Sequence, residues 1–224
     1  MKKNKIELGW HFLSNDYRLR YDDHRLVKKK IWIQAKECNN PVLCYKGMHA
    51  SKRLFDALGF APGSVLCRVK VRGKIKYASD KFVGMERFVV EMKNMDDIFE
   101  KFALWCYERA LTKNGTTNKK CWSVAKLKKY LLDGIGGEDI FALGEHLPYD
   151  NTQNAIRGCI FNMMRDLCTI QQDKIYYIRR MAEISRTVVG ASLNGTCDMR
   201  LESKELAIQN RKLTTMVKKY LNVE

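Results

Sequence analysis

The sequence predicts an α+β protein, in which a mixed or antiparallel β-rich N-terminal domain is followed by an all-helical C-terminal domain. Up to about residue 93, apolar and polar residues alternate with a period of two, most clearly over residues 67–72. From residue 94 onward the apolar residues recur with the 3.6-residue period of an amphipathic helix. We therefore expect two domains, residues 1–93 and residues 94–224.

Short apolar or alternating runs bounded by turn residues predict the strands of the first domain. We expect strands over residues 6–13, 31–33, 64–77 and 82–92. The apolar run 42–45 stops at Gly47, where the chain is expected to turn and to present His49 and Ser51. Ser51 is then a candidate N-cap for a short helix over residues 52–58, because its hydroxyl can accept from a free amide of the first turn.

Helical periodicity and cap residues predict the elements of the second domain. A first helix follows Asp96 as its N-cap and ends near Leu111, and Asn194-Gly195 stops a later one. We expect the other helices over residues 123–132, 155–167, 173–189 and 199–220.

The positive charge is concentrated in the first domain. The net charge is +16; residues 1–93 hold 21 Lys and Arg against 9 Asp and Glu, whereas residues 94–224 hold 20 against 16. Such a field attracts RNA, DNA, an anionic membrane surface or an acidic protein, although solubility alone is an alternative reason for it. The cations expected to form the binding surface are Lys28, Lys29, Lys30, Arg68, Lys70, Arg72, Lys74 and Lys76.

Five of these cations alternate with apolar residues along the expected strand 64–77. A strand face of this kind can present charge to phosphates. It can also protect a sheet edge from aggregation. Both interpretations stay open at this point.

Several classes of protein do not fit the sequence. No apolar run reaches the roughly 18 residues that a membrane span needs, and the apolar stretch after the basic N-terminus is too short for a signal peptide. The eight cysteines include no CxxC pair, so we expect reduced thiols in the cytoplasm, here that of a host cell. No phosphate-binding loop, HExxH, GxSxG or kinase signature is present, so conventional nucleotide hydrolysis is not expected.

The candidate catalytic residues are His11, His49 and Ser51. Two imidazoles on separate strands, one of them followed two residues later by a serine, can orient a ribose or a phosphate through ring donors and a hydroxyl. The alternative is that each histidine is a satisfied core residue. A zinc site would use Cys38, Cys44 and His49, with Cys67 as a fourth candidate ligand. The spacing of Cys38 and Cys44 is wider than is usual for zinc ligands, so no metal is expected.

The first domain resembles a family of uncharacterised bacteriophage accessory proteins. The resemblance covers roughly residues 8–92 and rests on four features: the segment 43–51 (Leu-Cys-Tyr-Lys-Gly-Met-His-Ala-Ser), the segment 56–58 with Pro62-Gly63, the strand with Val69 and Gly73, and the segment 80–83. It implies a bacteriophage accessory protein and carries over no established activity; an acidic host protein, for example a component of host defence, is one of the partners that we consider. The segment 102–110 resembles helices in phage and immunity-type proteins.

A more distant similarity is to ADP-ribosyltransferase-like folds of the two-histidine type, which include RNA 2′-phosphotransferases. His11, His49 and Ser51 match positions of that pattern, and Glu86 or Glu91 could fill the third catalytic position by location. This resemblance implies NAD or an RNA phosphate as substrate.

We therefore expect an accessory protein that binds a polyanionic partner, either nucleic acid or an acidic host protein. It needs no cofactor, and the helical domain could supply a homo-oligomer or partner surface. The alternatives are a transferase that uses NAD and a virion-associated structural protein. The residues leave open whether the protein is an enzyme.

Overall fold

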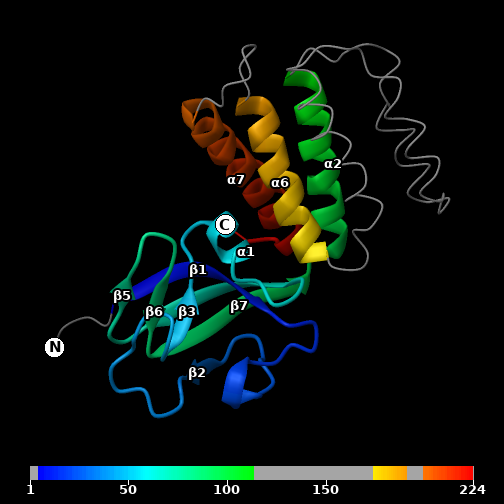
Figure 1. Ribbon diagram of the computed structural model, residues 1–224. Coiled ribbons are helices and arrows are strands. Elements are labelled where there is room, and N and C mark those ends of the chain that lie inside the picture. Colours follow the sequence, from blue (N-terminus) through cyan, green and yellow to red (C-terminus); the bar gives the residue numbers. More distant parts are fainter. Residues whose placement is uncertain (1–4, 114–173, 191–198, 224) are drawn as a thin grey trace. The chain divides into compact units, whose positions relative to one another are not determined.

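The antiparallel sheets occupy residues 6–94, with one short α-helix among their strands, and the long helices of the described chain follow them (Figure 1). The computed structural model describes residues 5–113, 174–190 and 199–223. The chain divides into two compact units, residues 1–98 with 213–224 and residues 99–212. The α+β class is therefore confirmed. The predicted domain boundary between residues 93 and 94 stays a prediction. The expected helices 123–132 and 155–167 lie outside the described residues.

A four-stranded antiparallel sheet forms the larger layer of the first unit. Its strand order is β1-β4-β7-β2, and β4 pairs with β1 over its whole length. The pairing of β4 with β7 shifts register between Arg68 and Val69. Its strands are β1 (Ile6–Leu13), β4 (Val65–Arg72), β7 (Glu86–Asn94) and β2 (Trp32–Gln34).

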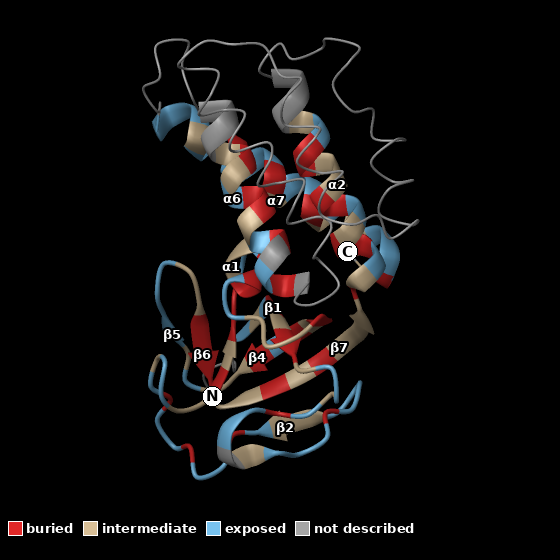
Figure 2. Cartoon of the chain, turned by 45° about the vertical axis from the view of Figure 1, so that its right-hand side comes forward, coloured by how far each residue is buried: buried red, intermediate tan, exposed pale blue. Residues whose placement is uncertain are grey.

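A smaller sheet has the order β3-β6-β5, with β3 (Met48–Ala50), β6 (Phe82–Gly84) and β5 (Lys76–Tyr77). It is joined to β1 by a backbone bridge: the Trp10 amide donates to the Ser51 carbonyl at 2.8 Å, and the Ser51 amide donates to the Trp10 carbonyl at 2.9 Å. Figure 2 shows the contrast between buried β6 and exposed β5. The middle strand of the small sheet is therefore part of the core.

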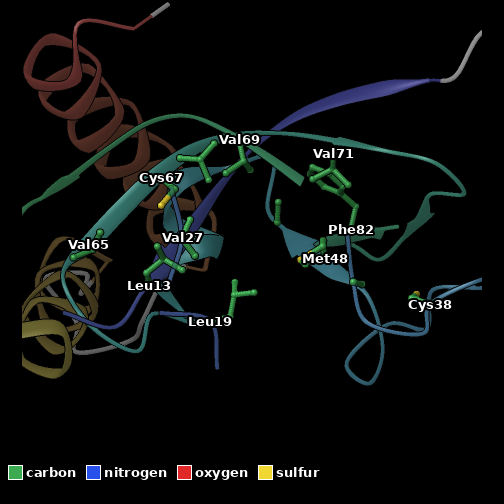
Figure 3. Close-up of a cluster of buried hydrophobic side chains, with 13 residues drawn as sticks. Leu13, Leu19, Val27, Cys38, Met48, Val65, Cys67, Val69, Val71 and Phe82 are labelled. Carbon is green, nitrogen blue, oxygen red and sulfur yellow. The ribbon is translucent and has the colours of Figure 1, made fainter. Parts of the chain in front are cut away.

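The core of this unit lies against one face of β4, where Cys67, Val69 and Val71 are fully buried (Figure 3). Leu13 from β1 and Phe82 from β6 contribute to the same cluster. The alternation predicted over residues 67–72 is confirmed, because every second side chain of a strand points to the same face. We call this the inner face of the large sheet and the opposite one its outer face.

Two expected strands are interrupted. The strand 64–77 ends at Arg72, because Gly73 has φ +92°, a left-handed conformation that glycine adopts without strain. The chain then enters β5, which belongs to the other sheet. The strand 82–92 is broken at Met85, whose amide donates to the Arg72 carbonyl at 3.0 Å, so that β6 and β7 also lie in different sheets.

The expected capping role of Ser51 is wrong. The helix α1 (Leu54–Leu58) begins after Arg53 and has no side-chain cap. Ser51 is buried and its backbone pairs with Trp10, so it extends the strand instead.

The apolar run 42–45 is a turn closed by the Val42–Lys46 bridge, and the strand with His49 follows Gly47. A 3-10 helix covers Tyr21–Asp23.

Three helices confirm the predicted periodicity: α2 (Asp96–Lys113), α6 (Lys174–Gly190) and α7 (Met199–Leu221). Asn94 Oδ1 accepts from the Asp96 amide at 2.8 Å at the start of α2. Within the second unit, Ser185 Oγ donates to the Cys106 carbonyl and Gln209 Nε2 to the Ala182 carbonyl, both at 3.0 Å. Of the helices described, none has the length and apolarity that crossing a bilayer requires.

Candidate functional site

A cavity of about 490 Å³ lies in the first unit, and all three predicted catalytic residues contribute to its wall. His11 comes from β1, His49 from β3 and Ser51 from the bridge that follows β3. His11 lies opposite Cys67 in the register of β1 and β4, which places it on the inner face of the large sheet. The backbone pairing of Trp10 with Ser51 therefore brings together residues that are 41 positions apart in the sequence.

The ring of His49 is held by its own loop. The Cys44 amide donates to His49 Nε2 at 3.0 Å, so Nε2 is an acceptor. Burial lowers the pKa of His49, and a hydrogen bond to the Gly47 backbone opposes this. Nε2 is thus used within residues 44–49, so the ring of His49 helps to position its own loop.

His11 is the imidazole that remains for chemistry in the cavity. Burial holds the pKa of His11 well below its usual range, and the nearby charge of Arg87 acts in the same direction. A hydrogen bond to the backbone of His49 acts in the opposite direction. His11 is consequently neutral at pH 7 and can donate from one ring nitrogen while the other accepts.

Arg87 is a site residue that the sequence interpretation missed. It is only 2% exposed, lines the same cavity, and donates from Nη1 to the His49 carbonyl at 3.1 Å. Burial lowers the pKa of Arg87 to about 10. One signal could have revealed it: Arg87 has the same strand parity as Val89, so the alternation of β7 places a charge at an inward position.

The predicted cations Arg68, Lys70 and Arg72 do share the outer face of the large sheet. The Arg68 guanidinium carbon lies 4.5 Å from the centroid of the Trp10 ring, and its Nη1 donates to the Gly9 carbonyl at 3.3 Å. Arg72 lies 3.9 Å from the Trp32 ring centroid and forms an ion pair with Glu86 at 2.7 Å. Lys70 is exposed and lies 5.9 Å from the Phe88 ring centroid.

The other predicted cations lie elsewhere in the first unit. Lys74 follows the turn at Gly73, and Lys76 belongs to β5 of the small sheet, so neither continues the row on β4. Residues 28–30 are exposed in the segment before β2, and Lys29 forms an ion pair with Glu91 at 2.7 Å. Glu86 and Glu91, the candidates for a third catalytic position, are therefore both engaged by cations on β4 or before β2.

The cysteines of the first unit are free thiols in the described part of the chain. Cys38 and Cys67 are buried and Cys44 is exposed. Burial raises the pKa of Cys67 to about 12, so it packs as a small apolar side chain. Within residues 5–113, 174–190 and 199–223, no three His, Cys, Asp or Glu side chains are grouped so that they could hold a metal ion.

Comparisons of the chain with protein-family models, with curated proteins and with solved structures gave no match.

Proposed function

We propose that the first unit binds single-stranded nucleic acid on the outer face of its large sheet. One observation carries this proposal: Leu8, Lys70, Phe88 and Trp32 stand side by side across the four strands. Aromatic rings on a sheet face can stack on bases, and interleaved cations can neutralise phosphates. Together they are the two elements of a sequence-tolerant single-strand site.

The charge of this row supports the proposal further. Lys70 is exposed, and no acidic side chain of the described residues forms an ion pair with it. Leu8 is 49% exposed beside it, so the row also presents an uncovered apolar surface. In the next row Arg72 forms an ion pair with Glu86 and packs on the Trp32 ring. This packing holds the Trp32 ring in place. We infer that Lys70 contacts phosphate while Trp32 and Phe88 contact bases.

A binding titration of labelled single-stranded RNA and DNA tests the proposal. Affinity is expected to fall steeply between about 50 and 200 mM salt, because counterions are released from each neutralised phosphate. Trp32→Ala should lose about 1–3 kcal/mol of binding free energy for each unstacked base. Lys70→Glu should weaken binding to both nucleic acids and lower the salt slope by about 1.

Lys204→Glu is the matched control, because it makes the same charge change at an exposed position of α7. It is expected to leave affinity within about twofold, because it changes the net charge by the same amount without altering the row of Leu8, Lys70, Phe88 and Trp32. Equal losses in the two charge variants would mean that net charge alone drives association. In that case the outer face would not be the site.

The wider role that we propose follows the resemblance to bacteriophage accessory proteins: binding of nucleic acid, or of an acidic host protein, in the cytoplasm of an infected cell. The helices would then provide an oligomer or partner surface. A pull-down from infected cells with and without nuclease separates these partners. Nuclease-resistant recovery of an acidic host protein would replace nucleic acid as the partner, and recovery in purified particles would favour the virion-associated role.

A transferase that uses NAD or an RNA phosphate is the second candidate, and the shared cavity of His11, His49 and Ser51 favours it. His11 is the side chain expected to contact the substrate, since His49 is held by its loop. Millimolar NAD should then raise the melting temperature, and His11→Ala should abolish that shift. Absence of any shift, together with no turnover of NAD or of a 2′-phosphorylated RNA, would remove the candidate.

A further inference from the structure

The cavity wall contains a buried arginine whose charge has no ion-pair partner among the described residues. Arg87 is 98% buried, and its one hydrogen bond in the described part of the chain goes to a backbone carbonyl, that of His49. Its Nε is also buried and finds no hydrogen-bond partner there. Buried charges are normally paired, because desolvation without a partner is costly. An anion bound at Arg87 would supply the missing partner.

Asp23, the one acidic residue in the cavity wall, raises the pKa of Arg87 through its charge but forms no ion pair with it. Asp23 accepts from Arg25 Nη2 at 2.6 Å through one carboxylate oxygen and from Arg25 Nε through the other. Lys36 Nζ lies 3.8 Å from the same carboxylate. Asp23 is therefore shared by two other cations, and the positive charge of the cavity is not cancelled from within.

The rest of the wall suits a small ligand that is both anionic and flat. Phe60 and Tyr45 are 48% and 86% exposed, which shows that the cavity opens to the surface beside aromatic rings. Lys81 Nζ lies 4.2 Å from the centroid of the Phe60 ring, at the same rim. The cations in the wall are Arg18, Arg20, Lys36, Lys46, Lys81 and Arg87.

We propose that this cavity binds a small organic phosphate with a planar ring, such as a nucleoside monophosphate, and that Arg87 is the residue that receives the phosphate. A volume of about 490 Å³ falls within the range of small-molecule sites, roughly 300–1,000 Å³. A guanidinium donates in a fork that matches phosphate oxygens, and the unpartnered Nε provides one arm of that fork. The ring of the ligand would lie against the aromatic rim.

This site is independent of the proposed nucleic-acid surface. Arg87 pairs with Val71 and Ile33 in the strand register and belongs to the inner face, whereas Lys70 and Phe88 belong to the outer face. His11 is the second polar group that a ligand could reach in the cavity. His49 and its loop hold the carbonyl that orients Arg87.

Titration of the full chain with AMP, GMP, CMP and UMP, with the four matching nucleosides and with inorganic phosphate, tests the proposal. The readout is the ¹H–¹⁵N signal of the Arg87 Nε–H group, assigned by its loss in Arg87→Lys. At least one monophosphate should move this signal saturably, and its nucleoside should not. The proposal is overturned if no phosphate compound moves the signal at millimolar concentration, or if inorganic phosphate binds as tightly as every nucleotide.

Two variants separate this site from a general charge effect. Arg87→Met should weaken nucleotide binding roughly tenfold or more, because charge-assisted hydrogen bonds are lost. Arg53→Met, at an exposed position before α1, should leave it unchanged. Equal affinity of Arg87→Met and the unaltered protein would refute the assignment. Arg87→Met should keep oligonucleotide affinity and Lys70→Glu should keep nucleotide binding, so failure of either proposal is distinguishable from failure of the other.

Discussion

Arg87 donates from Nη1 to the backbone carbonyl of His49 at 3.1 Å, although the two residues are 38 positions apart. This contact ties β7 of the large sheet to β3 of the small one and places a guanidinium beside His11. The same loop is fixed a second time, by the Cys44 amide on His49 Nε2. The polar wall of the cavity is therefore held by one contact between the two sheets and by one contact within the loop that precedes β3.

Replacing Arg87 is expected to cost little stability. Arg87→Met removes one hydrogen bond, worth about 1 kcal/mol, and also removes a buried charge without an acidic partner, which offsets that loss. The free energy of unfolding, measured by urea denaturation, should change by less than about 1 kcal/mol.

Leu13→Ala is the control on the same inner face and should cost about 2–5 kcal/mol, as large-to-small core substitutions do. If Arg87→Met destabilises the fold as much as Leu13→Ala, the arginine has a structural role that offsets its desolvation.

Acid should weaken the fold through His11 before the carboxylates contribute. Its pKa in the folded state is well below 6.5, so the unfolded chain binds a proton that the folded chain does not. Stability is therefore present in full above about pH 6.5 and falls as the pH decreases, by up to about 1.4 kcal/mol per pH unit and per proton. His49 shifts in the same direction and adds to the slope.

Urea denaturation at a series of pH values between about 6.5 and 5 measures this slope. His11→Gln should be less sensitive to pH than the unaltered protein, because the variant has no imidazole at position 11 to protonate. The window lies above the range of Asp23 and Glu91, whose pKa values are lowered and whose contributions are lost only at more acidic pH. Identical slopes in the two proteins would contradict a neutral His11 in the fold.

The sequence alone was sufficient to locate the strands and helices whose apolar residues recur with a regular local period. β1 is confirmed over residues 6–13, and α2, α6 and α7 lie where a period of 3.6 residues predicted them. The alternation of β4 correctly separated the core face from the charged face. In each case the apolar spacing alone decides which side is buried.

The parts that failed depend on distant partners. Ser51 has a hydroxyl that could cap a helix, but its backbone forms hydrogen bonds with Trp10, which joins the two sheets. Arginine is usually exposed, but Arg87 points into the core because β7 pairs with β4 and β2 in this register. Local propensity does not encode the pairing of Ser51. The inward position of Arg87 could have been inferred from its parity with Val89, but a charged residue is rarely expected in a core.

Gly47 is expected to be a position where a single methyl group is not tolerated. Its φ is +123°, and a Cβ there would lie 2.6 Å from Val83 Cγ2 and 2.9 Å from the Gly84 carbonyl oxygen. Gly47→Ala should therefore cost more than about 2 kcal/mol in unfolding free energy, from backbone strain and from the clash together. Gly59→Ala, at a right-handed helical position with its nearest contact at 3.1 Å, should cost less than about 1 kcal/mol. Thermal and urea unfolding of the two variants compare them, and similar losses would show that the turn at Gly47 can relax.

The loop that carries Cys44 should depend on the His49 ring. His49→Ala leaves the Cys44 amide without its acceptor, so exchange of that amide with deuterium is expected to accelerate by roughly tenfold, as about 1.4 kcal/mol of protection is lost. His24→Ala, at an exposed position, is the matched control and should leave the exchange unchanged. Unaltered exchange in His49→Ala would mean that the turn is held by the Val42–Lys46 backbone bridge alone.

The helical unit offers a test of a buried ion pair. Glu205 is 1% exposed on α7, and Arg109 on α2, whose side chain is 20% exposed, donates to its carboxylate. Glu205→Ala leaves Arg109 largely desolvated without its partner, so it is expected to cost about 3–5 kcal/mol of unfolding free energy. Lys204→Ala, one position earlier and exposed, should change stability by less than about 0.5 kcal/mol.

The double variant Arg109→Met with Glu205→Leu decides why the single substitution is costly. If the cost arises from an unpaired charge, replacing both partners by apolar side chains should recover most of the loss, because neither charge then has to be desolvated. If the double variant is as unstable as Glu205→Ala, the geometry of the pair itself, rather than its electrostatics, holds α2 against α7. Urea denaturation of the unaltered protein, Arg109→Met, Glu205→Leu and the double variant forms the cycle that separates the two explanations.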